Sequence, residues 1–286
     1  MTILPYRLLD CGEKQKLEYF GNKLLVRPCP QALWSKGKPE LWDLDVIDSE
    51  FVRTTEEKGY WKDVRGNIKG EKTNRNLPKS WTTSTANYLQ WNIQPNEFGN
   101  LGVFTEHWTY AEGLVNFFGK TAKVLNLFTY SGSNCVILAK NGIQITAVDS
   151  SRTAMDTYAA NLSLNKVDRA GQKLVLEDCY KFIARETRRG SKYDGVMIDA
   201  PSYGRGTKGE IFKIEDDLVR IVETCKELMT PGGKLVLTLH SPRFTPSGLR
   251  TLIQTMFENK KVEASEIVQK CESGRELPSG FLVKVG

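Results

Sequence analysis

The 286-residue sequence predicts an α/β protein, a doubly wound, mostly parallel seven-stranded sheet preceded by a small β-rich domain. Up to residue 98, short alternating runs are broken by Gly, Pro and Asn, a pattern typical of antiparallel hairpins. From residue 99 onward, apolar β-like segments alternate with helical segments, which predicts parallel strands joined by crossover helices. Two last β-like segments, 264–273 and 280–286, are expected to form an antiparallel hairpin at the sheet edge. The predicted domains are therefore 1–98 and 99–286.

Five β-α units account for most of the second domain. The expected strands are 123–130, 143–150, 173–180, 193–200 and 234–241. The helix expected after each strand covers 134–142, 151–165, 182–190, 214–229 and 247–260, respectively. Ser150 or Ser151 is expected to cap the second helix, because a serine hydroxyl accepts from a free N–H of the first turn. Pro231 and the two glycines after it are expected to end the fourth helix.

Composition excludes several classes of protein. Hydrophobic residues make up 40% of the chain and charged residues 26%, which is ordinary for a globular protein. The apolar runs are far shorter than the roughly 20 residues that span a bilayer, and the N-terminus lacks the pattern of a signal peptide. Six scattered cysteines and only two histidines indicate neither a disulfide framework nor a zinc cage. We therefore expect a cytoplasmic protein with reduced thiols, no membrane partner and no metal.

The excess positive charge is concentrated in one segment. The net charge is +6, and residues 58–81 contain seven Lys or Arg against two Asp or Glu, interleaved with Tyr60, Trp61 and Trp81. Cations that neutralise phosphates beside rings that stack on bases are typical of RNA-binding surfaces. A solvated edge hairpin explains the same composition. The segment alone therefore leaves both interpretations open.

Acidic residues end three successive strands of the predicted sheet. Asp149 follows the second strand, Asp178 the third and Asp199 the fourth. In a doubly wound sheet, ligands bind outside the carboxyl ends of the strands, at the point where the winding reverses. Each acid by itself suits a helix N-cap equally well. The ordered combination predicts a ligand site.

The chemistry of these positions suits a nucleoside that lacks phosphate. The turn after the first strand, "TYSGSN", has one glycine, Gly132, whereas a pyrophosphate needs several backbone N–H groups at close approach. A carboxylate such as Asp149 can accept from both hydroxyls of a ribose. Asp178, followed by Cys179, is placed to accept from the amino group of adenine. S-adenosylmethionine fits this description.

Several segments resemble the S-adenosylmethionine-binding motifs of class I methyltransferases. These are "NLFTYSGS", "AVDSS", "LEDCYKFI", "YDGVMIDAPSY" and "GGKLVLTLHS", with "GVFTEH" just upstream, and together they cover roughly residues 100 to 285. They are most similar to the ribosomal large-subunit RNA methyltransferase group that modifies cytosine C5 or guanine N7. The resemblance implies cofactor-binding roles for Asn126, Phe128, Thr129, Tyr130 and Gly132 at the methionine end, Asp149 and Ser150 at the ribose, Asp178 and Cys179 at the adenine, Thr105, Glu106 and His107 as a cover, and Asp199 beside the methyl group.

The methyl-accepting side differs from the family pattern at two places. The family motif D-P-P-x-[FY] stands here as Asp199, Ala200, Pro201, Ser202 and Tyr203, so the first proline is missing. The resemblance implies that Asp199 accepts an N–H of the acceptor base and that Tyr203 stacks on it. Relatives that modify cytosine C5 have a cysteine after the fifth strand, where this sequence has His240. Because C5 methylation needs a thiolate nucleophile, a heteroatom acceptor is expected, with His240 as a base or an RNA contact. The catalytic set is then Asp199, Pro201, Tyr203 and His240.

The sequence thus predicts an S-adenosylmethionine-dependent methyltransferase that modifies a base in RNA, with ribosomal RNA as the expected partner and the oligomeric state open. Two other classes share some of these features. An NAD-dependent dehydrogenase has the same type of fold but predicts a multi-glycine first turn. A non-catalytic RNA-binding protein with a relic cofactor pocket is suggested by Ala200 and His240 at altered motif positions.

Overall fold

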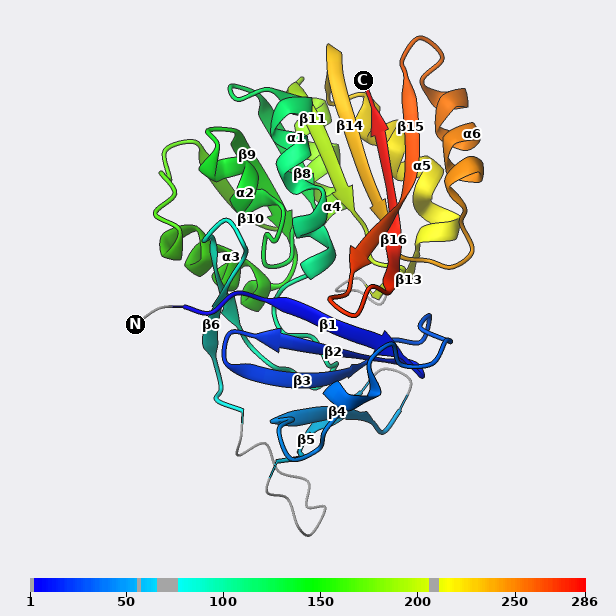
Figure 1. Cartoon of the computed structure of the whole chain (residues 1–286). Helices are drawn as coiled ribbons and strands as arrows, with labels where there is room; N and C mark the ends of the chain where they lie inside the picture. Colours follow the sequence, from blue (N-terminus) through cyan, green and yellow to red (C-terminus); the bar gives the residue numbers. More distant parts are fainter. Residues whose placement is uncertain (1–2, 56–57, 66–76, 206–210) are drawn as a thin grey trace. The chain divides into compact units, whose positions relative to one another are not determined.

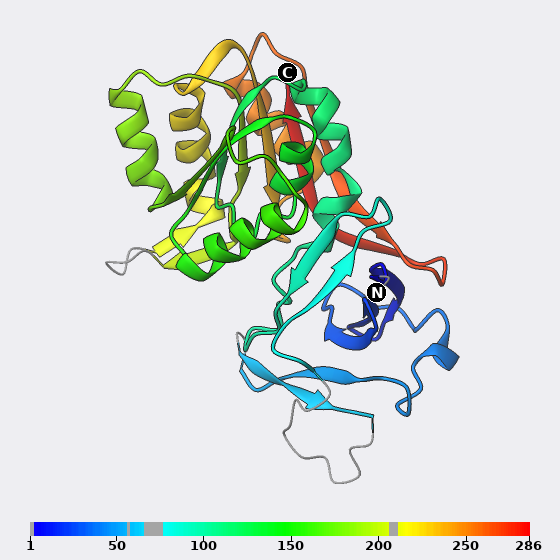
Figure 2. The same ribbon diagram turned by 90° about the vertical axis from the view of Figure 1, so that its left-hand side faces the viewer.

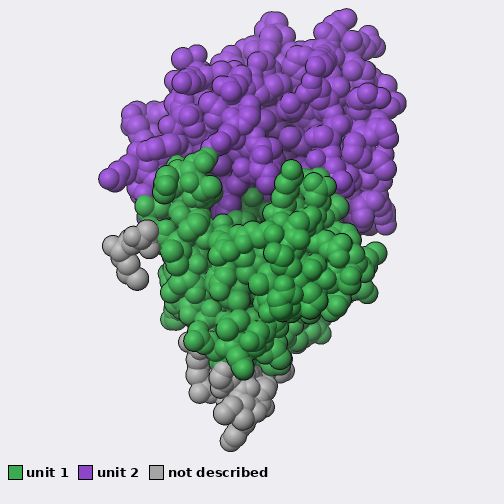
Figure 3. Space-filling view, in the orientation of Figure 1, with its two compact units in different colours: residues 1–105, 268–278 green, residues 106–267, 279–286 purple. Residues whose placement is uncertain are grey.

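The computed structural model describes residues 3–55, 58–65, 77–205 and 211–286 (Figure 1). The chain divides into two compact units, residues 1–105 with 268–278 and residues 106–267 with 279–286, which Figure 3 distinguishes by colour. The domain boundary expected after residue 98 stays a prediction. Residues 66–76, the middle of the basic segment, lie outside the described residues. The RNA-binding role of this segment therefore stays a prediction.

The first unit is built from short strands. Its elements are β1 (Arg7–Gly12), β2 (Gln15–Phe20), β3 (Lys23–Pro28), η1 (Pro39–Leu41), β4 (Ser49–Arg53), β5 (Gly59–Asp63), β6 (Trp81–Ser84) and β7 (Gln90–Ile93). β1 to β5 form one sheet in chain order, and β6 pairs with β7. The prediction of hairpins is confirmed for β1, β2 and β3, which pair antiparallel. It is wrong for β3 and β4, which are parallel; a parallel pair needs a crossover rather than a tight turn, and residues 29–48 supply it.

A buried carboxylate lies within this first sheet. Glu18 on β2 is completely inaccessible to solvent. Its two oxygens accept from Arg27 Nε at 2.7 Å and Nη2 at 3.0 Å and from Tyr6 Oη at 2.9 Å, and Lys16 Nζ lies 3.1 Å away. Burial acts to raise the pKa of Glu18, but the charges of Arg27 and Lys16 outweigh it and lower that pKa to about 2. Glu18 is therefore an ionised, fully paired acid.

The second unit contains the predicted seven-stranded sheet, with strand order β10-β9-β8-β11-β14-β16-β15. The strands are β8 (Lys123–Leu127), β9 (Gln144–Asp149), β10 (Gln172–Leu176), β11 (Tyr193–Asp199), β14 (Met229–Leu239), β15 (Val262–Lys270) and β16 (Glu276–Val285). The first five of these in chain order pair in parallel, which confirms the fold class. The last two segments lie at the end of the sheet as expected, with β15 as the edge strand and β16 between β14 and β15, antiparallel to β14.

Helices cover both faces of this sheet (Figures 1 and 2). They are α1 (Ala111–Phe118), α2 (Cys135–Lys140), α3 (Arg152–Leu164), α4 (Cys179–Arg188), α5 (Ile214–Lys226) and α6 (Pro246–Met256), with a 3-10 helix, η2, at Thr105–Thr109 and a small strand pair, β12 (Tyr203–Arg205) and β13 (Ile211–Lys213). Side chains of α4, α5 and α6 share one apolar core with the central strands. Within the described residues, no helix is long and apolar enough to cross a membrane.

One local prediction needs correction, and one helix was not predicted. Helix α5 ends at Lys226, and Pro231 with its glycines lies inside β14 instead of ending the helix. A proline is tolerated at this place because it stands near the start of the strand, before the pairing with β11 resumes at Lys234. Helix α1 was not anticipated; its apolar side chains Leu114, Val115 and Phe118 are buried.

Candidate active site

The parallel strands bring the predicted acids to one edge of the sheet. Leu176 at the end of β10 pairs with Asp149 at the end of β9, and Asp199 at the end of β11 pairs with Thr238 of β14. β8 lies between β9 and β11, so the loop that follows β8 emerges between Asp149 and Asp199. This is the place where the winding of the sheet reverses, at which doubly wound proteins bind their ligands.

The loop after β8 has an unusual backbone. Phe128, Tyr130 and Gly132 all have positive φ angles, of 58°, 51° and 74°. Such angles are costly for residues with a Cβ, and they persist where surrounding contacts impose them. Here the Tyr130 N–H donates to Asp149 Oδ2 at 2.8 Å, and the Thr129 N–H donates to the Val148 carbonyl at 3.1 Å. Asp149 therefore shapes the loop as well as ending its own strand.

Gly132 is required by packing as well as by its backbone angle. A Cβ at this position would lie 2.1 Å from Cδ2 of Tyr158, whose ring is completely buried on α3. No side chain fits at that distance. The glycine therefore lets helix α3 pack directly against the loop, a role separate from the close approach of a ligand that the sequence suggested.

Unsatisfied polar atoms gather at the same loop. Nδ2 of Asn126, at the end of β8, and Oγ of Ser131 are buried and have no hydrogen-bond partner. Asp149 accepts one hydrogen bond at each oxygen, from Tyr130 and Ser151, which leaves lone pairs on both. Buried polar atoms without partners are uncommon in proteins and call for an explanation. A ligand with hydroxyl and polar amino-acid groups, such as S-adenosylmethionine, fits this donor and acceptor set.

At the next strand end, Asp178 is a helix cap. Its Oδ1 accepts from the Lys181 N–H at 3.0 Å and so caps α4. Ser151 rather than Ser150 caps α3, and Ser150 is exposed. Cys179 is buried, and its thiol points to the Val148 carbonyl at 3.8 Å. The second oxygen of Asp178 is the group left for an adenine amino group, so a contact there stays a prediction.

Asp199 lies at the centre of a polar cluster at the end of β11. The Thr238 hydroxyl donates to Oδ1 of Asp199. His107 Nε2 lies 3.1 Å from Oδ2, and His240 Nε2 lies 3.7 Å from Oδ1. The His107 side chain is 3% exposed, that of Asp199 11%, and that of His240 32%. His240 is thus the member of the cluster that solvent reaches.

Charge and burial together set the protonation of this cluster. Burial acts to raise the pKa of Asp199, but the charge and hydrogen bond of His107 and the contact with His240 hold it well below its usual range. Burial acts to lower the pKa of His240, but the hydrogen bond and charge of Asp199 outweigh it and raise that pKa to about 9. The Asp199 carboxyl is therefore ionised near neutral pH.

The sequence singled out Asp199, His107 and His240 as site residues, but it did not predict that the two histidines lie against Asp199. His107 was expected over the cofactor, and the structure places it against Asp199. Thr238 was not anticipated, although a threonine that interrupts the apolar run of β14 at the register of Asp199 was a usable signal.

The remaining predicted site residues are less tightly placed. Pro201 is exposed, and Tyr203 on β12 is 43% exposed. The Glu106 charge contributes to the raised pKa of His240. Thr105 belongs to the first unit, where its hydroxyl accepts from Gln269 Nε2 at 2.9 Å.

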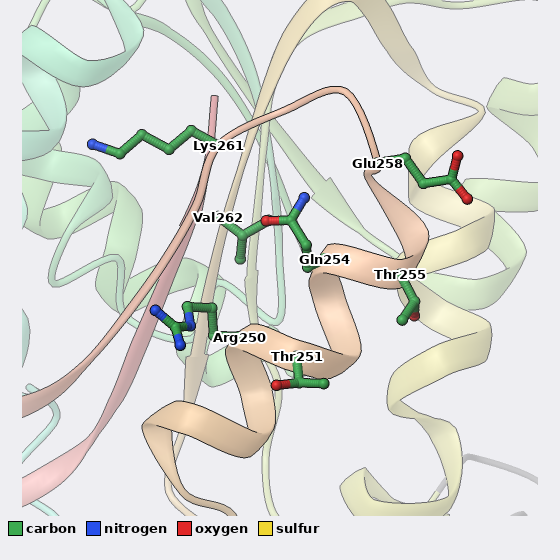
Figure 4. Close-up of a pocket in the computed structure, with 7 residues that line it drawn as sticks. All are labelled: Arg250, Thr251, Gln254, Thr255, Glu258, Lys261 and Val262. Atoms are coloured by element: carbon green, nitrogen blue, oxygen red, sulfur yellow. The ribbon is translucent and has the colours of Figure 1, made fainter.

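A groove of about 740 Å³ lies elsewhere on the second unit, along α6 (Figure 4). It is lined by Arg250, Thr251, Gln254, Thr255, Glu258, Lys261 and Val262. None of the predicted site residues contributes to it. The strand ends, rather than this groove, hold the convergent polar groups.

Fold and site together define a doubly wound α/β protein with polar groups that converge at its strand ends. Residues 79–280 match the model of a family described as S-adenosylmethionine-dependent methyltransferase. The chain belongs to this family. The predicted family and its cofactor are thereby confirmed, and neither the dehydrogenase nor the non-catalytic alternative is supported.

Similar proteins extend the comparison. Ribosomal RNA large subunit methyltransferase I of Enterobacter sp. (strain 638) is 31% identical over 160 residues, which are 55% of this chain and 39% of that protein. Ribosomal RNA large subunit methyltransferase K/L of Allochromatium vinosum is 25% identical over 207 residues, 67% of this chain and 28% of that protein. The chain thus spans less than half the length of these curated relatives. A crystal structure of an S-adenosylmethionine-dependent methyltransferase from Agrobacterium tumefaciens is 29% identical, with a TM-score of 0.85 and coverage of 99% of this chain and 91% of that one.

Proposed function

We propose that this protein transfers a methyl group from S-adenosylmethionine to a base heteroatom in RNA, with ribosomal RNA as the substrate. The observation that carries the proposal is the single sheet edge that joins Asp149, the unpartnered Nδ2 of Asn126 and the Asp199 cluster. The printed names of the two curated relatives supply the support for ribosomal RNA.

The proposed cofactor contacts follow from the free hydrogen-bonding capacity at this edge. Asp149 would hold the ribose hydroxyls, and Asn126 would donate to the methionine end. Phe128, Thr129, Tyr130 and Gly132 would form the surrounding loop, and Asp178 would meet the adenine. When bound, the cofactor supplies an electrophilic methyl group on a sulfonium. Asp199 would orient the acceptor base by accepting one of its N–H groups, and Tyr203 would stack on it, since positioning supplies much of the acceleration in a displacement of this kind.

The state of the cysteines supports a heteroatom acceptor. All six are free and buried. Burial raises the pKa of Cys135, Cys179 and Cys225 far above the usual range, so these thiols stay protonated. Methylation of cytosine C5 requires an accessible thiolate, whereas a nitrogen or oxygen with a lone pair requires none.

Cofactor binding is tested by calorimetry with S-adenosylmethionine and with NAD. We expect Asp149→Asn to weaken S-adenosylmethionine binding about 10-fold or more, the effect of losing charge-assisted hydrogen bonds. The matched control is Asp168→Asn, since Asp168 is an exposed acid outside the site. Tight binding of NAD without binding of S-adenosylmethionine would contradict the proposal.

Methyl transfer is tested with labelled cofactor and unmodified ribosomal RNA, followed by mass mapping of the modified nucleoside. A label on a ring nitrogen, an exocyclic amine or a hydroxyl is the expected result. A 5-methylcytosine product would refute the argument from the buried thiols. Cofactor binding without any transfer to RNA would refute RNA as the substrate.

A further inference from the structure

Both histidines of the 286-residue chain meet at the same carboxylate. One donor atom each of His107, Asp199 and His240 lies within 4.8 Å of the other two. The three residues come from η2, the end of β11 and the end of β14, so the fold rather than a local motif assembles them. Two imidazoles and one carboxylate are a set of ligands that divalent transition metals use in proteins.

We propose that His107, Asp199 and His240 form a binding site for a divalent transition-metal ion. An ion held at about 2 Å from each donor atom would require the donors to lie within about 4 Å of one another. His107 Nε2 lies 3.1 Å from Oδ2 of Asp199 and His240 Nε2 lies 3.7 Å from Oδ1, so each histidine meets this requirement with one oxygen of a carboxylate that binds through both. His240 is the partly exposed ligand, so its ring can make the remaining adjustment without disturbing the core.

The outer contacts of two ligands suit metal binding. Nδ1 of His240 lies 3.2 Å from the Ser279 carbonyl, which can only accept, so Nδ1 keeps its hydrogen and Nε2, which faces Asp199, is the nitrogen that would bind the ion after the ion displaces its proton. The Thr238 hydroxyl donates to the Asp199 carboxylate and fixes its orientation. Partners of this kind orient metal ligands and sustain affinity.

The ligand set also indicates which ions bind. Imidazole nitrogens suit Zn²⁺, Co²⁺, Ni²⁺ and Fe²⁺, whereas Mg²⁺ and Ca²⁺ prefer sites made of oxygen. Three protein ligands leave at least one coordination position for water or another small molecule. The ion site shares Asp199 and His240 with the proposed methyl-transfer site, but it is tested separately, because ion binding is measured without cofactor or RNA.

The site is tested by titrating the full chain, freed of metal by chelation, with Zn²⁺ in a calorimeter and with Co²⁺ in an absorption spectrometer. We expect one ion per chain and a change in the Co²⁺ absorption bands that reports nitrogen ligands. His240→Gln should weaken binding by about 100-fold or more and Thr238→Val by about 10-fold, the latter being typical of an outer-contact residue. The control Asp168→Asn removes an exposed carboxylate outside the site and should leave the affinity unchanged.

Two readouts keep the test decisive. Binding of S-adenosylmethionine, measured on each variant, shows that the second unit is folded and tests the proposed function separately. Absence of Zn²⁺ and Co²⁺ binding in the wild-type chain would overturn the inference and leave the cluster as a hydrogen-bonded triad. Equal binding by wild-type protein and the His107→Gln/His240→Gln double variant would also overturn it, because the ion would then be held elsewhere.

Discussion

Each of the two units buries a carboxylate among basic side chains, and these side chains differ in kind. In the first unit Glu18 is enclosed within a sheet by Arg27 and Lys16, whose charges lower its pKa. In the second unit Asp199 ends a strand and faces His107 and His240. An imidazole can gain and lose a proton near neutral pH, whereas a guanidinium cannot.

The difference indicates that Glu18 stabilises the fold, whereas Asp199 takes part in chemistry. Glu18 has no exposed surface and four nitrogen or hydroxyl atoms around it, so no hydrogen-bonding capacity faces a ligand. The Asp199 cluster reaches solvent through His240 and stands at the edge where the loop after β8 emerges. We therefore expect changes at Glu18 to affect stability and changes at Asp199 to affect chemistry.

The largest expected effect is on stability in the first unit. Glu18→Gln keeps the shape but leaves the charges of Arg27 and Lys16 uncompensated in a buried place, which typically costs about 3–5 kcal/mol. Urea unfolding of the full chain measures it. The control is Glu13→Gln, because Glu13 pairs with Lys36 at an exposed position and should change stability by less than about 1 kcal/mol. Equal changes in the free energy of unfolding for the two variants would contradict the stabilising role of Glu18.

Acid should weaken the same unit. The pKa of Glu18 is about 2 in the folded protein against an ordinary value of 4.5, so its contribution is complete above about pH 4.5 and is lost as the pH falls toward 2. The shift corresponds to roughly 3 kcal/mol. Unfolding measured between pH 6 and pH 2, within about this window, should show a steeper loss for the wild-type protein than for Glu18→Gln. Parallel curves would contradict the assigned pKa.

In the second unit, Asp199→Asn should lower the rate of methyl transfer by about 100-fold, or about 2.7 kcal/mol in the barrier, while S-adenosylmethionine binds within a few-fold of wild type. Stability should fall less than for Glu18→Gln, because the raised pKa of His240 depends on the Asp199 charge, and this partly exposed imidazole can become neutral once that charge is removed. Labelled methyl transfer, calorimetry and urea unfolding provide the three measurements. If Asp199→Asn were as unstable as Glu18→Gln but transferred methyl groups at the normal rate per folded molecule, Asp199 would stabilise the fold and would not take part in the chemistry.

The smallest expected effect is at Asp178, and it distinguishes the capping of α4 from a contact with adenine. Asp178→Ser keeps an oxygen that caps α4, so stability should change by less than about 1 kcal/mol, whereas Asp178→Ala should lose about 1 kcal/mol with the cap. If Asp178 also contacts adenine, both variants should bind S-adenosylmethionine about 10-fold more weakly, as expected for a lost hydrogen bond to a charged group. Unchanged affinity in both would leave Asp178 as a cap alone.

Much of the second unit could be predicted from the chain because its signals are local. Apolar runs that end on Asp149 and Asp199 mark buried strands and their exits, and Ser151 and Asp178 are cap residues beside their helices. The order of strands and helices then leaves few possible sheets, since crossovers between parallel strands have one handedness. These features determined the fold class, the family and the edge of the sheet that carries the site.

Only the tertiary structure decided which distant residues meet. The parallel pairing of β3 with β4, the insertion of β16 beside β14, and the meeting of His107 with Asp199 and His240 depend on through-space packing. The positive φ angles of Phe128 and Tyr130 are imposed by contacts with Val148 and Asp149 rather than by their own preferences. Sequence patterns encode period and burial, whereas partners across a fold are selected by the packing of the whole chain.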